Sequence, residues 1–167
     1  MLYLRIIISF VNMKKIINPW EGVEGYMCFA CSPPQNPNGL HMEFFEDEDD
    51  VVALWKPTKY EQGWLDTLHG GIQSTLMDEV AGWVIVRKLQ TTGVTSRLEA
   101  KFMKSISTKE PQISVRGGRI KEQKRNAVFL ERKYSIRREN YAHGPTSYIL
   151  SLVLKKHRKN FTSKDVR

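Results

Sequence analysis

Residues 70–89 read GGIQSTLMDEVAGWVIVRKL, a stretch of twenty residues without a proline. Placed on a helical wheel, its apolar side chains lie nearly all round. Those on one side are Ile72, Leu76, Val80 and Trp83, and those around the rest are Met77, Ala81, Val84 and Ile85. A helix with this pattern is buried. The stretch therefore predicts one long central helix, about 30 Å from end to end.

The segments on both sides of this helix have the pattern of β-strands. Before it, residues 40–45 alternate between apolar and polar, and the apolar run 51–55 follows acidic residues 46–50, which predicts a hairpin. After it we expect four strands, at 94–103, 112–120, 127–136 and 147–154, with charged residues 121–125 as a turn. This order predicts an α+β fold, with a curved antiparallel sheet wrapped around the helix. Because such a sheet leaves edge strands exposed, we also expect a homodimer.

The length and charge of the chain limit its function further. With 167 residues, 41% of them hydrophobic, it suits one compact domain. Its net charge of +8 is concentrated at the C-terminus, where six basic residues and one acid between Lys155 and Arg167 give +5 and leave about +3 for the rest. No aromatic stacking array accompanies these charges, so we expect no nucleic-acid partner and interpret residues 157–167 as a solvated basic tail.

The cysteines and the N-terminus bear on location. Cys28 and Cys31 are too few for a disulfide framework, so a reducing cytoplasm is the expected compartment. Residues 2–11 are largely apolar, but they reach about half the length of a membrane span and lack an obvious cleavage site, so no membrane partner is expected. We interpret residues 1–25 as an N-terminal extension, with Met13 as an alternative start of translation, and 26–156 as the domain.

The first turns of the predicted helix carry the residues that point to chemistry. Gly70 and Gly71 let another group approach the backbone closely, and the free N–H groups at a helix start favour developing negative charge. Ser74, Asp78 and Gly82 follow at i,i+4 spacing, so a polar stripe runs down an otherwise apolar helix. Gly82 would leave space beside the carboxylate. Because a buried carboxylate is costly unless it is paired, we interpret Asp78 as a functional residue.

The run His69-Gly70-Gly71, followed at the correct spacing by Leu76 and Asp78, resembles the motif of the hotdog-fold acyl-CoA thioesterases, particularly the phenylacetate-pathway type, over residues 26–156. The resemblance implies a hotdog fold and hydrolysis of an acyl-CoA thioester, with no metal and no cofactor beyond the coenzyme A of the substrate. It implies that the Gly70 N–H polarises the thioester carbonyl. It also implies that Asp78 attacks or activates water from the neighbouring subunit of a homodimer or homotetramer.

Further residues follow from the same resemblance. Related enzymes place a hydroxyl at the start of the strand after the helix, where Thr95 matches best and Ser96 is the alternative. His69 either fixes the loop or contacts the substrate carbonyl, and Gly71, Ser74 and Gly82 are expected to border the substrate. Two positions depart from the pattern: Gly63 stands where some relatives carry an asparagine, and Ser105 stands where many carry a proline.

Two other groups of residues allow more than one interpretation. Glu79 is the rival carboxylate, which we expect to pair across an interface rather than to act in catalysis. Cys28 and Cys31, followed by Asn36-Pro-Asn-Gly-Leu40, look like the entry to the domain in a subset of the family. Their spacing suits zinc, but a structural site needs four ligands and His41 adds one at most, so a loop role is preferred over a metal site.

The charged turn at 116–125 and the reaction class also leave alternatives open. Arg116 and Arg119 are expected to meet the phosphates of coenzyme A, although a solvated hairpin tip has the same composition. Hydrolysis of an acyl-CoA is the leading hypothesis. The alternatives are a non-catalytic hotdog protein that binds acyl-CoA and a hotdog dehydratase, which fits the Asp78 pattern less well.

Overall fold

The computed structural model describes residues 13–32, 35–102, 104–118, 120–124, 127–134, 136–138, 141–142 and 146–155. From residue 121 onward the description covers the backbone together with the side chain of Val128. The predicted basic tail at 157–167 and Arg119 therefore lie outside the described residues.

The central helix, α2, runs from Gly70 to Leu89, as predicted. His69 caps its first turn, because the ring Nδ1 accepts a hydrogen bond from the Gly71 N–H at 2.8 Å. At the other end Gln90 adopts the left-handed conformation, with φ 50°, and its side-chain amide donates to two carbonyl groups of the last turn. Both ends of the helix are thus capped by side chains of the adjoining residues.

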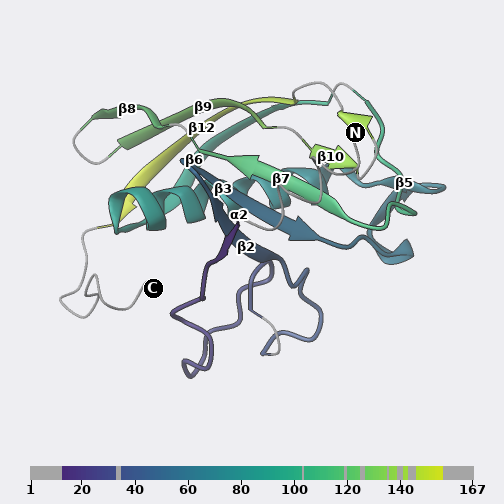
Figure 1. The fold of residues 1–167 in the computed structure, drawn as a ribbon, viewed down its shortest axis with the longest axis horizontal. Helices are drawn as coiled ribbons and strands as arrows, with labels where there is room; N and C mark the ends of the chain where they lie inside the picture. The colour runs from purple at the N-terminus through teal and green to yellow at the C-terminus, as the bar shows by residue number, and fades with distance from the viewer. Residues whose placement is uncertain are drawn as a thin grey trace.

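Antiparallel strands form two larger sheets beside α2 and a small sheet of β4 (Gln62–Trp64) and β5 (Thr67–Leu68), and the predicted α+β class is confirmed (Figure 1). The first sheet has the order β1 (Lys14–Lys15), β2 (Glu43–Asp47), β3 (Asp50–Trp55), β7 (Ile113–Gly117), β10 (Ile136–Arg138) and β11 (Tyr141–Ala142). The second has the order β6 (Thr92–Lys101), β12 (Thr146–Lys155), β9 (Ala127–Tyr134) and β8 (Ile120–Lys124). A short segment of η1 (Lys59–Glu61), β4 and β5 leads into α2.

The core encloses α2 on more than one side. The ring of Trp83 stacks on Phe44 of β2 at a centroid distance of 4.8 Å and meets Trp20 edge-on at 5.9 Å. Other fully buried residues of α2, such as Val84, join sheet residues such as Val115 in one cluster. Burying one such side chain contributes roughly 1.5–3 kcal/mol relative to leaving it exposed. The all-round apolar pattern of the helix is explained by these contacts.

One predicted turn is wrong. Residues 121–125 were expected to form a charged turn, but Ile120–Lys124 is strand β8, which pairs with β9. β8 lies at the end of its sheet in the order β6-β12-β9-β8. An edge strand has solvent on its free side and carries charged residues readily, so a charged composition did not distinguish strand from turn here.

The described part of the N-terminal extension packs with the body. Lys14 and Lys15 pair with β2, and Ile16 is 6% exposed within the core cluster. In Figure 1 the segment between β1 and β2, coloured purple to blue, lies on the side of the molecule away from β8, β9 and β12. Among the helices of the described residues, none has the length and apolarity that crossing a bilayer requires.

Candidate active site on the central helix

α2 and β6 bring the predicted carboxylate and hydroxyl together. Thr95 Oγ1 donates a hydrogen bond to Asp78 Oδ1 at 2.5 Å, from a position 17 residues further along the chain. Asp78 is half-buried and Thr95 is exposed in the single chain. Within the described part of the chain, Asp78 Oδ2 has no hydrogen-bond partner. The pair is therefore a carboxylate oriented through one oxygen, with the other oxygen available to a proton or to a carbonyl carbon.

The alternative hydroxyl, Ser96, falls at an irregularity of β6, where Arg97 and Thr95 pair with consecutive residues of β12 and Ser96 between them is the extra residue. The hydrogen bond to Asp78 comes from Thr95, the residue that pairs with Leu152 beside this irregularity. The geometry therefore favours Thr95 as the partner of the carboxylate.

The first turn of α2 presents one available donor. The Gly71 N–H is engaged by the ring of His69, so it is not free to bind a substrate in this conformation. The Gly70 N–H has no acceptor among the described residues. A Cβ added at Gly70 would lie 3.5 Å from Cε2 of Phe102, which is ordinary van der Waals contact. Of the two glycines, Gly70 is thus the one with an N–H that can meet developing negative charge.

His69 fixes the loop before α2, which is one of the two roles that the sequence left open. Its backbone N–H donates to the Glu61 carbonyl at 2.9 Å, and its Nδ1 accepts from Gly71. Because Nδ1 is an acceptor, the proton of the neutral ring is assigned to Nε2. The side chain is exposed, so His69 fixes the loop through one nitrogen and presents a donor on the other.

The departure at Gly63 has a steric reason. A Cβ at this position would lie 2.9 Å from His69 Cδ2 and 3.0 Å from His69 Cα. An asparagine here would displace the residue that caps α2, so the chain keeps a glycine. The neighbouring Gln62 accepts the backbone N–H of Asp66 at 3.3 Å and so helps to shape the turn before the helix.

The polar stripe on α2 is only partly a network. Ser74 Oγ donates to the carbonyl of Gly70 at 3.0 Å, four residues back, rather than to Asp78. A Cβ added at Gly82 would meet nothing within 4 Å. The stripe therefore borders open space in the single chain. Asp78 lies between Ser74, whose hydroxyl already has an acceptor, and Gly82, which has no side chain.

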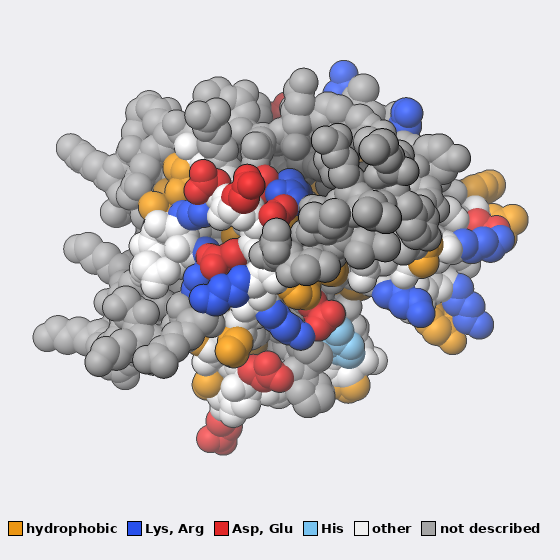
Figure 2. Space-filling view, viewed as in Figure 1, with side chains coloured by type: hydrophobic (Ala, Val, Ile, Leu, Met, Phe, Trp, Pro, Cys, Tyr) orange, Lys and Arg blue, Asp and Glu red, His pale blue; other side chains and the backbone are white. Residues whose placement is uncertain are grey.

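Arg116 has partners that compete with a phosphate. It lies in β7 rather than in a turn, and its guanidinium pairs with Asp47 and, at 3.1 Å, with Asp50. Burial lowers the pKa of Arg116, but hydrogen bonds to the two carboxylates outweigh it and raise the pKa overall. Among the described side chains on the face drawn in Figure 2, acidic and basic groups lie close to one another. A contact between Arg116 and coenzyme A stays a prediction.

Glu79, next to Asp78, has its partners inside the chain. Trp83 Nε1 donates to Glu79 Oε1 at 3.0 Å, and Cys28 Sγ lies 3.9 Å from the same oxygen. Burial, with Cys28 nearby, raises the pKa of Glu79 to about 7. The proximity of Glu79 to Cys28 was not predicted, because the two residues are 51 positions apart in the sequence. Only the i,i+4 spacing of Glu79 and Trp83 gave a local signal.

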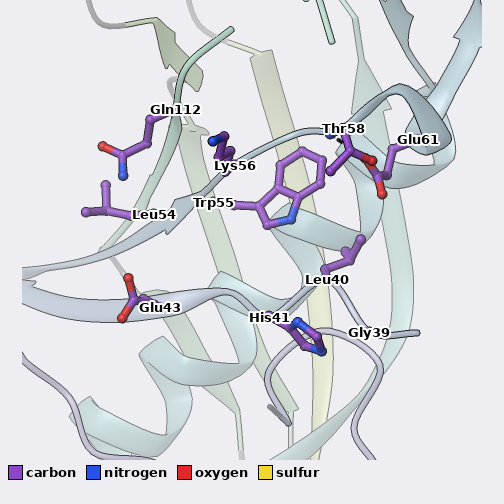
Figure 3. Close-up of a pocket in the computed structure, with 10 residues that line it drawn as sticks. All are labelled: Gly39, Leu40, His41, Glu43, Leu54, Trp55, Lys56, Thr58, Glu61 and Gln112. Carbon is purple, nitrogen blue, oxygen red and sulfur yellow. Dashed lines mark hydrogen bonds between the residues drawn. The ribbon is translucent and has the colours of Figure 1, made fainter. Parts of the chain in front are cut away.

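A cavity lies elsewhere, beside the first sheet (Figure 3). It holds about 340 Å³, and none of its lining residues belongs to α2 or β6. Figure 3 shows the Trp55 ring pointing into it between His41 and the paired side chains of Thr58 and Glu61. The carbonyl of Glu61 accepts the His69 N–H, so the cavity adjoins the loop before α2 without containing any predicted site residue.

Neither a protein-family model nor a curated protein matches the sequence. Solved structures do match. A hypothetical thioesterase from Streptococcus pneumoniae TIGR4, solved with coenzyme A, is 19% identical with a TM-score of 0.60, over 78% of this chain and 97% of that chain. Zebra fish thioesterase superfamily member 2 is 18% identical with a TM-score of 0.61, over 76% and 91%. The protein smu.793 from Streptococcus mutans UA159, bound to acetyl CoA, is 12% identical with a TM-score of 0.62, over 83% and 100%.

At these identities the structures show the fold. The long helix and its antiparallel strands form the hotdog fold that the His-Gly-Gly motif predicted. The phenylacetate-pathway type, the assembly and the roles of the site residues stay predictions.

Proposed function

We propose that this hotdog-fold chain hydrolyses acyl-CoA thioesters to a free acid and coenzyme A. The observation that carries the proposal is the 2.5 Å hydrogen bond from Thr95 Oγ1 to Asp78 Oδ1, beside the N-terminal half of α2. A hydroxyl that donates to one oxygen of a carboxylate orients the other oxygen for chemistry. Two proteins of the same fold, bound to coenzyme A and to acetyl CoA, support the substrate class.

In the general-base route, Asp78 Oδ2 accepts a proton from a water molecule while the water oxygen attacks the thioester carbonyl carbon. The oxyanion that forms receives the Gly70 N–H, and the Nε2–H of His69 orients the carbonyl. The tetrahedral intermediate then expels the coenzyme A thiolate, which takes up the proton from Asp78.

In the nucleophilic route, Asp78 Oδ2 attacks the carbonyl carbon directly and displaces the thiolate. Water then hydrolyses the anhydride formed between Asp78 and the acyl group. One oxyanion donor contributes roughly 3–4 kcal/mol and a positioned base about 10²–10⁴ in rate.

The geometry of α2 favours a site shared by two chains. Asp78 lies eight residues after Gly70, which is about 12 Å along a helix, and the Gly70 N–H points beyond the helix start, away from Asp78. An attacking atom lies about 3–3.5 Å from the carbonyl carbon, and an oxyanion donor about 3 Å from its oxygen. Gly70 and Asp78 of one chain are too far apart for direct attack. We therefore expect Gly70 of one chain to act with Asp78 of another, in a homodimer.

Features around Asp78 are consistent with such a partner. β6, which carries Thr95, ends one of the described sheets, and its residues 94–97 are exposed in the single chain. The open space at Gly82 adjoins the same stripe of α2. A second chain could cover this surface and complete the site, and pairing of two dimers would give the tetramer.

The proposal is tested by a hydrolysis screen. Purified chain is mixed with short-chain, long-chain and aryl acyl-CoAs, and the released thiol is followed with a disulfide reagent. Turnover of at least one class is expected, with loss of that turnover in Asp78→Asn. Binding of acyl-CoA by calorimetry without any turnover would overturn the proposal and establish the non-catalytic alternative.

A further inference from the structure

Glu79, the residue after Asp78 on α2, lies close to two cysteines from a distant part of the chain. All three side chains are of types that can bind metal ions. Cys28 and Cys31, in the segment between β1 and β2, and Glu79 each place a ligand atom within 4.8 Å of the others. The two sulfur atoms are 3.0 Å apart, and Cys28 Sγ lies 3.9 and 4.0 Å from the two carboxylate oxygens. The helix thus supplies a third donor that the local spacing of the two cysteines did not reveal.

The cluster gathers acidic groups without a cation. Cys31 is 4% exposed, and Cys28 and Glu79 are partly buried. In the described part of the chain no Lys or Arg forms an ion pair with Glu79, whose other contact is the Trp83 indole. Anionic groups that are buried together cost free energy unless protons or a cation neutralise them. A divalent cation would neutralise this set.

We propose that Cys28, Cys31 and Glu79 bind Zn²⁺, with water in the fourth position. Two thiolates select zinc over magnesium or calcium, and three protein ligands with one open position are a known zinc arrangement. With Zn–S about 2.3 Å and Zn–O about 2.0 Å in a tetrahedron, the sulfurs would lie about 3.8 Å apart and each sulfur about 3.5 Å from the oxygen. From the present distances, the two sulfurs would separate by about 0.8 Å and the Cys28 sulfur would approach the Glu79 oxygen by about 0.4 Å.

Neighbouring groups already hold the three ligands in place. The Cys31 N–H donates to Cys28 Sγ at 3.4 Å, and the Tyr26 hydroxyl lies 3.1 Å from Cys31 Sγ. Trp83 Nε1 orients the carboxylate of Glu79 at 3.0 Å. Outer-shell hydrogen bonds of this kind fix metal ligands and tune their affinity. Bound zinc would tie the segment that carries Cys28 and Cys31 to the helix next to Asp78.

The test uses cobalt as a spectroscopic probe. The full chain is purified under reducing conditions, stripped with a chelator and titrated with Co²⁺, then with Zn²⁺. We expect the visible bands of tetrahedral Co²⁺ with a thiolate charge-transfer band in the near ultraviolet, saturating at one metal per chain. Zn²⁺ should displace the cobalt and raise the midpoint of thermal unfolding, because it binds the folded chain.

Neighbouring carboxylates provide a matched control. Glu79→Gln should weaken Zn²⁺ binding at least ~10-fold, since even the loss of an outer-shell partner costs that much. Cys28→Ser should also remove most of the charge-transfer band. Asp78→Asn, one residue away on the same helix, should bind metal like the parent. Circular dichroism identifies any variant that fails to fold, and in that case the parent spectrum and Glu79→Gln decide.

Three results would overturn the proposal. They are a parent chain without the charge-transfer band, equal binding by the parent and Glu79→Gln, and a Cys28–Cys31 disulfide that binds no metal after reduction. The readout does not depend on hydrolysis, so a chain that binds cobalt as expected but turns over no acyl-CoA would refute the proposed function and leave the metal site standing.

Discussion

Asp78 and Glu79 are neighbours in the sequence, yet they belong to two different regions of the molecule. A helix turns successive side chains by about 100°. Asp78 meets Thr95 of β6 at a surface that is open in the single chain, whereas Glu79 meets Trp83 and Cys28 on the side of α2 that faces the segment between β1 and β2. The helix register thus gives two adjacent carboxylates different surroundings.

The two regions also differ in what they lack. The Asp78 region holds an oriented carboxylate, but its oxyanion donor lies about 12 Å away along the same helix, so it needs a second chain and a substrate. The Glu79 region holds its three donors within one chain and needs only a cation. A proposed catalytic site that is incomplete in one chain and a proposed metal site whose three protein ligands lie in one chain call for different tests.

The largest expected effect separates the two carboxylates directly. Asp78→Asn keeps the shape of the side chain and removes both base and nucleophile, so turnover should fall at least ~100-fold. Acyl-CoA binding should survive, because contacts to coenzyme A do not depend on this carboxylate. Glu79→Gln should lower turnover far less. Single-turnover thiol release measures both variants, and hydrolysis at the parent rate by Asp78→Asn would assign the chemistry elsewhere.

The second effect tests whether the open region is shared between chains. Gly70→Pro removes the N–H at the first helical position, where proline is tolerated, and His69 before it already has an extended ψ of 134°. Loss of one oxyanion donor should lower turnover about 10²–10³-fold. The helix should remain intact by circular dichroism.

Mixing the two inactive variants sharpens the same point. In a mixed dimer of Asp78→Asn and Gly70→Pro chains, one of two shared sites combines an intact Gly70 with an intact Asp78. Activity should therefore return, up to half of the parent value per dimer. If Gly70 and Asp78 act within one chain, both sites of the mixed dimer lack a group and no activity returns.

The third effect concerns the hydroxyl that orients the carboxylate. Thr95→Val keeps the side-chain volume and removes the donor to Asp78, so the maximal rate should fall about tenfold, at the scale of one lost hydrogen bond to a charged group. Ser96→Ala, which removes the neighbouring hydroxyl of β6, is the matched control and should leave the rate near that of the parent. Equal rates for the two variants would show that the Thr95 contact is not used in turnover.

The sequence predicted the elements whose local pattern matches their environment. The helix at 70–89 is apolar nearly all round because core residues pack against it, so its sequence pattern predicted that it would be buried. The resemblance also placed Thr95 ahead of Ser96, and Thr95 is the residue that donates a hydrogen bond to Asp78. Strand β8 was mistaken for a turn because an edge strand and a turn accept the same charged residues.

Contacts between distant segments could not be predicted in this way. Glu79 was expected at an interface, since nothing near it in the sequence indicates that Cys28 and Cys31 fold back onto α2. The same holds for Arg116, whose carboxylate partners lie 66 and 69 residues away. The periodicity of a segment indicates which of its faces is buried. Which residues contact that face depends on tertiary packing.

The fourth effect tests which of the two arginines, Arg116 or Arg119, binds coenzyme A. Arg116 pairs with Asp47 and Asp50, so Arg116→Gln should lower stability by about 1–2 kcal/mol, because it leaves two neighbouring carboxylates without their cation. Arg119→Gln should instead raise the Michaelis constant with little change in the maximal rate, as expected when ground-state binding is lost. The rise should shrink at high salt. Denaturant unfolding and steady-state kinetics on both variants distinguish a structural from a binding arginine.

The smallest effect comes from Gly82, beside Asp78 on the open face of α2. An added Cβ meets nothing within 4 Å in the single chain, and alanine is favoured over glycine inside a helix by about 0.5–1 kcal/mol. Gly82→Ala should therefore raise the free energy of unfolding by about that amount. If the space beside the carboxylate receives the acyl group, the same methyl should raise the Michaelis constant. A fall in stability that follows protein concentration would show that a second chain, rather than the substrate, fills this space.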